Sequence, residues 1–164
     1  MLAPQLSAKV REPRQAGSPT SLRFTIPGEP QGKGRARIGK VGGFSRLFTP
    51  AKTLAYEGLV AQMAQQAMAG APLMEGPVSL SLELLHTIPR SAPKRQRADM
   101  LSGRMRPTKK PDADNVVKAI FDGINGVVWN DDVQVCGLNM TKRYACTPGV
   151  EVLVSPIDDA LFAA

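Results

Sequence analysis

The stretch KPDADNVVKAIFDGINGVVWNDD, residues 110–132, decides the second half of the fold. Pro111 disfavours helical backbone in the residue before it, so a helix is expected to begin at about Asp112 and to run to about Asn125. Its apolar residues recur at helical spacing and predict one buried stripe, made of Val116, Val117, Ile120 and Ile124. The dipeptide Asn125-Gly126 is a strong turn signal, so the chain should reverse there. Acidic residues therefore fall at the start of the helix and again after the turn.

Strands are expected before and after this helix. Residues 22–26 alternate between apolar and polar side chains and are followed by Pro27-Gly28, which predicts a strand that ends in a turn. Residues 78–88 alternate over a longer stretch. Two last strands are predicted at 133–144 and 150–155, joined around Thr147-Pro-Gly149.

An earlier helix is predicted between the first two strands. Thr49 is a typical N-cap and Pro50 suits the first helical position. The run to about Ala69 has apolar residues at helical spacing, and Gly70 supplies a stop. The stripe expected to face the core consists of Leu54, Leu59, Met63 and Ala67.

The resulting order is β-α-β-loop-α-β-β, an α+β fold with a mixed sheet and two main helices packed on one face of it. Residues 31–37 form a glycine-punctuated basic loop, and a turn at 39–43 precedes a short segment at 44–48. Residues 89–110 lack periodicity and are predicted to be a loop that orders on substrate. Residues 1–20 are rich in Pro, Gly, Ser and charge, which predicts a mobile tail before a single domain at 21–164.

The charge of the chain favours a polyanionic partner. It carries 21 Lys and Arg against 14 Asp and Glu, a net charge of +7, which favours nucleic acid over a membrane surface. Six bases and no acid lie in residues 31–56, and eight bases with one acid lie in residues 89–110. Residues 111–132 reverse the balance, with five Asp and one Lys. Acid beside basic loops is what a metal-dependent enzyme acting on phosphates needs.

Several classes of protein are disfavoured by composition. Cys136 and Cys146 with the single histidine, His86, do not make a zinc site, and we expect reduced thiols buried in neighbouring strands and a structural histidine. No apolar run approaches the ~20 residues of a membrane span. The polar N-terminus lacks the apolar stretch of a secretory signal, so a cytoplasmic protein is expected.

The acidic residues have two interpretations. Asp112 and Asp114 suit the positive end of a helix, so they could serve only as a cap and a dipole partner. Alternatively, a short helix-turn-strand excursion could bring Asp132 back to the helix start. Three carboxylates without histidine or thiolate would select Mg²⁺, with Mn²⁺ as a substitute, over zinc. A metal so held would screen a phosphodiester and activate a water.

Several motifs of the chain resemble those of a known family. Lys110-Pro-Asp-x-Asp-Asn-x-x-Lys118-x-x-x-Asp122-Gly-x-Asn125, followed by Trp129-x-Asp-Asp132-x-Gln-Val135, is similar to the signature of the RusA family of Holliday-junction resolvases, common in phages and prophages. Ile26-Pro-Gly-x-Pro-x-Gly-Lys-Gly-Arg35 and Phe48-Thr-Pro-x-Lys-Thr53 also resemble phage members. The likeness extends over residues 22–155.

The resemblance implies the site residues by motif position. Asp112, Asp114 and Asp132 correspond to metal-binding catalytic aspartates and Lys118 to a catalytic lysine, with Asp131 as the weaker alternative to Asp132. The resemblance further implies a Mg²⁺-dependent endodeoxyribonuclease for branched double-stranded DNA, acting in recombination and repair as a homodimer, whose two symmetric sites suit a four-way junction.

The basic segments are expected to hold DNA by its phosphates. The residues predicted to do so are Lys33, Arg35, Arg37, Lys94, Arg95, Arg97, Lys109 and Lys110. Two alternatives stay open: a non-catalytic nucleic-acid-binding protein whose acids only cap a helix, and a nuclease for other branched phage replication intermediates. Any single base could also be solvated surface charge, and Trp129 is expected to be a core or hinge anchor.

Overall fold

A mixed four-stranded sheet forms the centre of the computed structural model, which describes residues 21–157. The strands are β1 (Leu22–Pro27), β4 (Val78–Thr87), β5 (Val135–Ala145) and β6 (Gly149–Pro156), in the order β1-β6-β4-β5. β6 pairs antiparallel with both β1 and β4, whereas β4 and β5 are parallel. The α+β fold with a mixed sheet is therefore confirmed. The predicted tail at 1–20 lies outside the described residues, as do residues 158–164.

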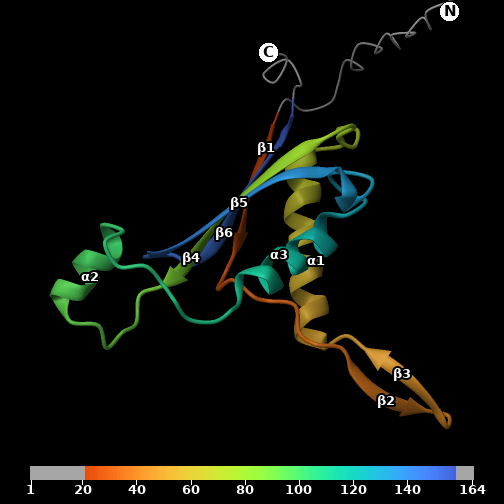
Figure 1. Ribbon diagram of the computed structural model, residues 1–164, viewed down its shortest axis with the longest axis horizontal. Coiled ribbons are helices and arrows are strands. Elements are labelled where there is room, and N and C mark those ends of the chain that lie inside the picture. The colour runs from red at the N-terminus through yellow and green to blue at the C-terminus, as the bar shows by residue number, and fades with distance from the viewer. Residues whose placement is uncertain (1–20, 158–164) are drawn as a thin grey trace, which may run out of the picture.

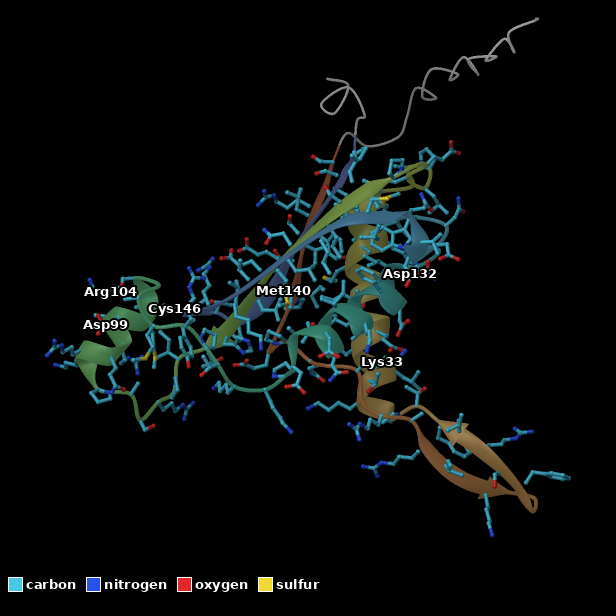
Figure 2. All side chains as sticks on the ribbon, viewed as in Figure 1. Lys33, Asp99, Arg104, Asp132, Met140 and Cys146 are labelled. Atoms are coloured by element: carbon cyan, nitrogen blue, oxygen red, sulfur yellow. The ribbon has the colours of Figure 1, made fainter. Side chains whose placement is uncertain are left out.

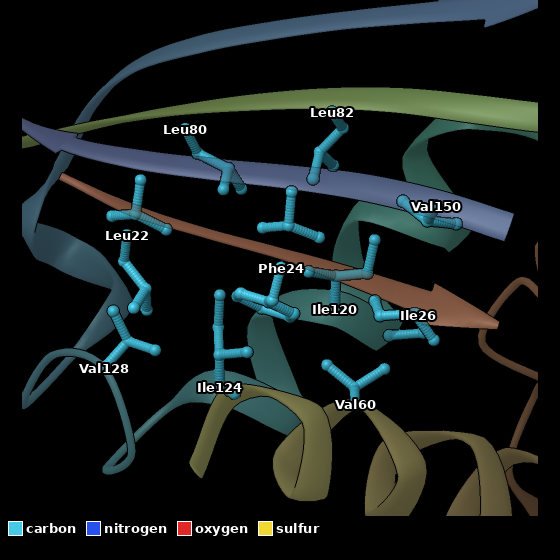
Figure 3. Close-up of a cluster of buried hydrophobic side chains, with 14 of the residues drawn as sticks. Leu22, Phe24, Ile26, Val60, Leu80, Leu82, Ile120, Ile124, Val128 and Val150 are labelled. Carbon is cyan, nitrogen blue, oxygen red and sulfur yellow. The ribbon is translucent and has the colours of Figure 1, made fainter. Parts of the chain in front are cut away.

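Two helices cover one face of the sheet, as predicted (Figure 1). They are α1 (Ala51–Met68) and α3 (Ala113–Ile124). Figure 3 shows the core between this face and the helices, where Phe24, Ile26, Val60 and Ile120 meet. Since a parallel strand pair needs a crossover connection, α3 lies on the path from β4 to β5.

The predicted boundaries of α3 and its buried stripe are close to those observed. Val116, Ile120 and Ile124 are fully buried, and Val117 packs against the core while partly buried. Three of the four residues predicted for the α1 stripe, Leu59, Met63 and Ala67, pack against the core while partly buried, but the fourth does not. Leu54 is 55% exposed, and the buried residues are Thr53, Tyr56, Val60, Ala64 and Met68.

The start of α1 also differs from the prediction. Pro50 occupies the N-cap and no side chain makes a capping hydrogen bond, so Thr49 is not the cap. Pro50 still sets the start, because its carbonyl accepts hydrogen bonds from the amides of Thr53 and Leu54.

The basic stretch after the glycine-punctuated loop forms a hairpin. β2 (Arg37–Val41) pairs antiparallel with β3 (Phe44–Phe48) as a separate two-stranded sheet. Gly42 and Gly43 have φ angles of 59° and 84°, the left-handed values that a two-residue hairpin turn requires. The hairpin projects from the body of the molecule at the lower right of Figure 1.

The segment predicted to be a loop at 89–110 contains a helix, which is a correction. This helix, α2 (Lys94–Leu101), buries only Met100, which packs with Ile88 and Tyr144 in a small cluster apart from the main core. One buried residue in eight leaves no apolar periodicity in the sequence, so the pattern did not indicate a helix.

Three expectations about single residues were tested. Trp129 is fully buried and meets Phe121 edge to face, with ring centroids 5.8 Å apart, which confirms it as a core anchor. His86 is buried as predicted, 1% exposed. Cys136 and Cys146 are unpaired, but both are exposed, so the prediction that they are buried was wrong. Cys136 is the second residue of β5, an edge strand of the sheet, and Cys146 directly follows the end of that strand.

No helix within residues 21–157 is long and apolar enough to cross a membrane.

Candidate active site

The first turn of α3 presents two carboxylates to solvent. Asp112 occupies the N-cap position, with φ −67° and ψ 142°, but its side chain makes no capping hydrogen bond. Asp114 follows in the first turn with its side chain 65% exposed. The interpretation of Asp112 as only a helix cap is therefore weakened, because its carboxylate makes no capping hydrogen bond.

Lys118 lies one turn further along α3, against Asp114. Its Nζ donates to Asp114 Oδ2 at 3.5 Å, and both side chains are more than 60% exposed. An exposed pair of this geometry contributes a few tenths of a kcal/mol. The ammonium is therefore available to swing toward another anion near Asp114.

The last turn of α3 carries a second charged group. Asp122 forms an ion pair with Lys33 from the basic loop, and this hydrogen bond raises the pKa of Lys33. Glu57 of α1 faces the same aspartate. Burial raises the pKa of the Glu57 carboxyl, and the negative charge of Asp122 adds to the rise, while Lys33 opposes it. One lysine is thus shared by two acids.

Asp131 and Asp132 follow the turn after α3. Asp131 caps the short 3-10 helix η1 (Asp132–Gln134), accepting from the amide of Val133 at 3.0 Å. Gln134 fixes this segment by donating to the carbonyls of Met74 and Gly76, at 3.0 and 2.9 Å. The pKa of Asp132 is raised, first by its hydrogen bond with Asp131, then by burial and by the charges of Asp131 and Asp122.

The predicted meeting of Asp132 with Asp112 and Asp114 is not present, which corrects the expected geometry. Over residues 21–157 no three His, Cys, Asp or Glu side chains are grouped so as to hold a metal. Asp132 senses the charge of Asp122, and Asp122 lies eight residues beyond Asp114, about 12 Å along the helix axis. The turn is tight, with the Gly126 amide bonded to the Trp129 carbonyl at 2.9 Å, so it returns the chain to the end of α3 and not to its start.

The basic loop at residues 31–36 is clamped between α1 and α3. The Lys33 amide donates to the Asn115 carbonyl at 2.8 Å, and the Gly34 amide donates to Thr53 Oγ1 at 3.0 Å. A Cβ on Gly34 would lie 2.9 Å from that hydroxyl oxygen. A Cβ on Gly32 would lie 3.0 Å from Cβ of Asn115. The two glycines therefore allow this backbone to lie directly on the helices.

A cavity of about 790 Å³ opens between this loop and the start of α3. Asp112 and Asn115 line one side of it. Five basic residues also line it: Lys33, Arg35, Arg37, Lys52 and Lys110. Such a cavity combines an exposed carboxylate with charges that attract phosphate. Figure 2 shows Lys33 and Asp132 on the same side of the molecule, around α3.

The predicted DNA-binding residues divide into two groups in space. Arg35, Arg37 and Lys110 line the cavity. Lys33 lines it as well, and its ammonium forms an ion pair with Asp122. Lys109 precedes Lys110 in the chain but is not among the residues that line the cavity. The remaining three, Lys94, Arg95 and Arg97, lie on α2, at the opposite end of the long axis from the hairpin (Figure 1).

Two residues near the site were not among those predicted to act there, namely Asp122 and Glu57. The spacing of Asp114, Lys118 and Asp122, four residues apart on one helix stripe, was the signal for Asp122. Glu57 gave no such signal, because only the packing of α1 on α3 brings it to Asp122.

Comparison with known proteins gives two matches. The family model for "Endodeoxyribonuclease RusA" matches residues 27–155. The chain is also similar to the uncharacterized protein YqaN of Bacillus subtilis (strain 168), with 34% identity over 138 residues, which cover 83% of this chain and 96% of that protein. The family match covers the loop at residues 31–36, the acidic residues of α3, strands β4 and β5 and nearly all of β6.

Proposed function

Because the chain belongs to the RusA family of endodeoxyribonucleases, we propose that it cuts Holliday junctions or related branched DNA by Mg²⁺-dependent hydrolysis of phosphodiester bonds, in recombination and repair. The observation that carries this proposal is the cavity that Asp112 lines together with Arg35, Arg37 and Lys110. A phosphate drawn in by these bases would lie beside the carboxylates of α3.

The metal would be held by carboxylates alone. Asp112 and Asp114 at the start of α3 are the ligands proposed. Asp132, or Asp131 in its place, lies toward the other end of α3 and would join them only if the turn after α3 shifted when the ion binds. Carboxylate oxygens without histidine or thiolate suit Mg²⁺, and Mn²⁺ as its substitute. When bound, the ion supplies charge screening and an activated water.

The residues of the chain have separate roles in this proposal. The bases of the cavity orient the phosphate, and Lys118 leaves its weak contact with Asp114 to meet a phosphate oxygen. Lys33 offsets the charge of Asp122 and Glu57, so that these acids do not repel the substrate.

The assembly proposed is a homodimer, because two symmetric sites can nick opposed strands of a four-way junction. With DNA as substrate and phage or prophage members in the family, we propose that the protein acts in the bacterial cytoplasm.

The test is a nicking assay on a synthetic four-way junction, with Mg²⁺, with Mn²⁺ and with EDTA. We expect paired nicks near the branch point with either metal and none with EDTA. Binding of the junction without cleavage would instead favour a non-catalytic DNA-binding protein. Faster cleavage of flaps or forks than of the four-way junction would keep the chemistry and change the substrate to other replication intermediates.

A further inference from the structure

The β2–β3 hairpin exposes apolar side chains that no other part of the described chain covers. Ile38, Phe44 and Leu47 are 75%, 77% and 73% exposed. A two-stranded hairpin alone is marginally stable in water, and large exposed apolar groups gathered on one element indicate an interaction site. The hairpin therefore has the features of an arm that packs against something outside the chain.

The charge of the hairpin indicates which class of molecule binds it. Arg37, Lys40 and Arg46 lie on its two strands, and residues 31–56 contain no acid. A second copy of the hairpin would bring these like charges together, at a cost. A polyanion would neutralise them, which favours nucleic acid.

The strand register sorts the side chains into two faces. Ile38 is paired with Leu47, and Lys40 with Ser45, so an apolar pair and a base share one face. Arg46 lies opposite Gly39 on the other face, and the ring of Phe48 covers that glycine, whose added Cβ would lie 2.7 Å from the ring. Each face therefore carries both a base and an apolar group.

The hairpin is also joined to the proposed catalytic cavity. Arg37, the first residue of β2, lines that cavity together with Asp112. Since the loop before β2 is clamped on α1 and α3, the direction in which the hairpin leaves the body is set by the same contacts that shape the cavity. A DNA strand in the cavity would continue along the hairpin.

From these observations we infer that the β2–β3 hairpin is a wedge for branched DNA. Ile38, Leu47 and Phe44 pack against bases that are unstacked at the branch point, while Arg37, Lys40 and Arg46 contact the neighbouring phosphates. Apolar side chains inserted between base steps are a known way for proteins to hold open DNA. This inference rests on the proposed function, because it takes branched DNA as the substrate.

The test measures unstacking directly, with 2-aminopurine placed beside the branch point of a four-way junction. Binding is followed in Ca²⁺, so that the result does not depend on cleavage. The wild type should raise the fluorescence of this base on the junction and not on a linear duplex of the same sequence. The triple variant Ile38→Ser, Phe44→Ser, Leu47→Ser should lose more than half of the rise, because all three side chains are exposed and their loss leaves the core intact.

The matched control is Leu54→Ser with Leu101→Ser, two side chains that are 55% and 54% exposed on other elements. This double variant should keep the wild-type fluorescence. A triple variant with wild-type fluorescence and affinity would overturn the inference, as would failure of the wild type to bind the junction. Sedimentation of the triple variant as a smaller species than wild type would also overturn it, because the hairpin would then be a contact between subunits. Failure of the proposed function would give a different result, namely a normal fluorescence rise in Ca²⁺ without nicking in Mg²⁺.

Discussion

The two basic segments of this chain have similar charge and different surroundings. The segment from the glycine loop to the hairpin is anchored by backbone hydrogen bonds to α1 and α3, and it shares a cavity with Asp112. The segment around α2 is attached through Met100 in a small cluster of its own, and it carries its own acid, Asp99, paired with Arg104 at 2.7 Å. The first segment is placed by the contacts that build the proposed site, and the second is not.

The number of bases in a segment therefore does not indicate which of them act on the substrate. A base has a catalytic consequence only where backbone contacts hold it toward the carboxylates. Bases on an exposed helix far from α3 add affinity for DNA through counterion release without orienting the reacting phosphate. The following predictions test whether the two segments differ in this way.

The largest difference is expected between an acid at the start of α3 and an acid on α2. Asp114→Asn should lower cleavage of a four-way junction by more than about 100-fold, since metal-held charge contributes several kcal/mol to the transition state. Junction binding should stay equal or tighten, because a negative charge that faces phosphate is lost. Single-turnover cleavage and a binding titration measure the two effects.

The matched control is Asp99→Asn, which removes an acid beside the bases of α2. It should cleave at the wild-type rate. If Asp114→Asn lost its fold, as followed by circular dichroism, the helix-cap interpretation of this residue would be supported instead.

A second prediction concerns one base from each segment. Arg35→Ala and Arg97→Ala should each weaken junction binding and lower the slope of log affinity against log salt by about one. Only Arg35→Ala should also slow cleavage at saturating protein, because Arg35 lines the cavity with Asp112. An unchanged salt slope for Arg35→Ala would remove the loop from the DNA interface.

The clamp under the loop gives a third prediction, of stability. Gly34→Ala should destabilise the protein by about 1–3 kcal/mol in urea unfolding, because its Cβ would press on Thr53 and Pro50. Gly58→Ala is the control, since a Cβ on that helical glycine meets nothing within 4 Å. It should raise stability by up to about 1 kcal/mol. Equal stability of the two variants would mean that the loop is not clamped.

The smallest effect is expected at Glu57, whose folded-state pKa is raised by burial and by Asp122. A carboxyl with a raised pKa favours folding when protonated, and this benefit is lost as the pH rises through that pKa. Glu57→Gln should therefore raise the melting temperature at pH 7 by about 1–2 °C, corresponding to roughly 0.5 kcal/mol. The gain should shrink toward pH 4, and Glu75→Gln, a change of an exposed glutamate, should show no such trend.

Much of the fold could be predicted because local signals and packing agree. Pro111 and Asn125-Gly126 mark the ends of α3, and the alternation in β1 and β4 matches their buried faces. The fully buried residues of α1 were harder to predict, because they include small or polar residues such as Ala64 and Thr53, while Leu54 faces solvent.

The hairpin and the arrangement of the acids were harder to predict. All side chains of β3 are exposed, so no apolar alternation indicates a strand there. The position of Asp132 depends on how tightly the chain turns after α3, and Gln134 fixes that through contacts with residues 74 and 76. Those contacts are long-range, and a sequence motif carries no information about them.

The position of a bound divalent ion tests most directly whether the start of α3 is the catalytic centre. In crystals soaked with Mn²⁺, the anomalous signal should place the ion within coordination distance, about 2.0–2.2 Å, of a carboxylate oxygen of Asp112 or Asp114. An ion bound only elsewhere, with both of these side chains left unligated, would contradict the claim that the start of α3 is the catalytic centre.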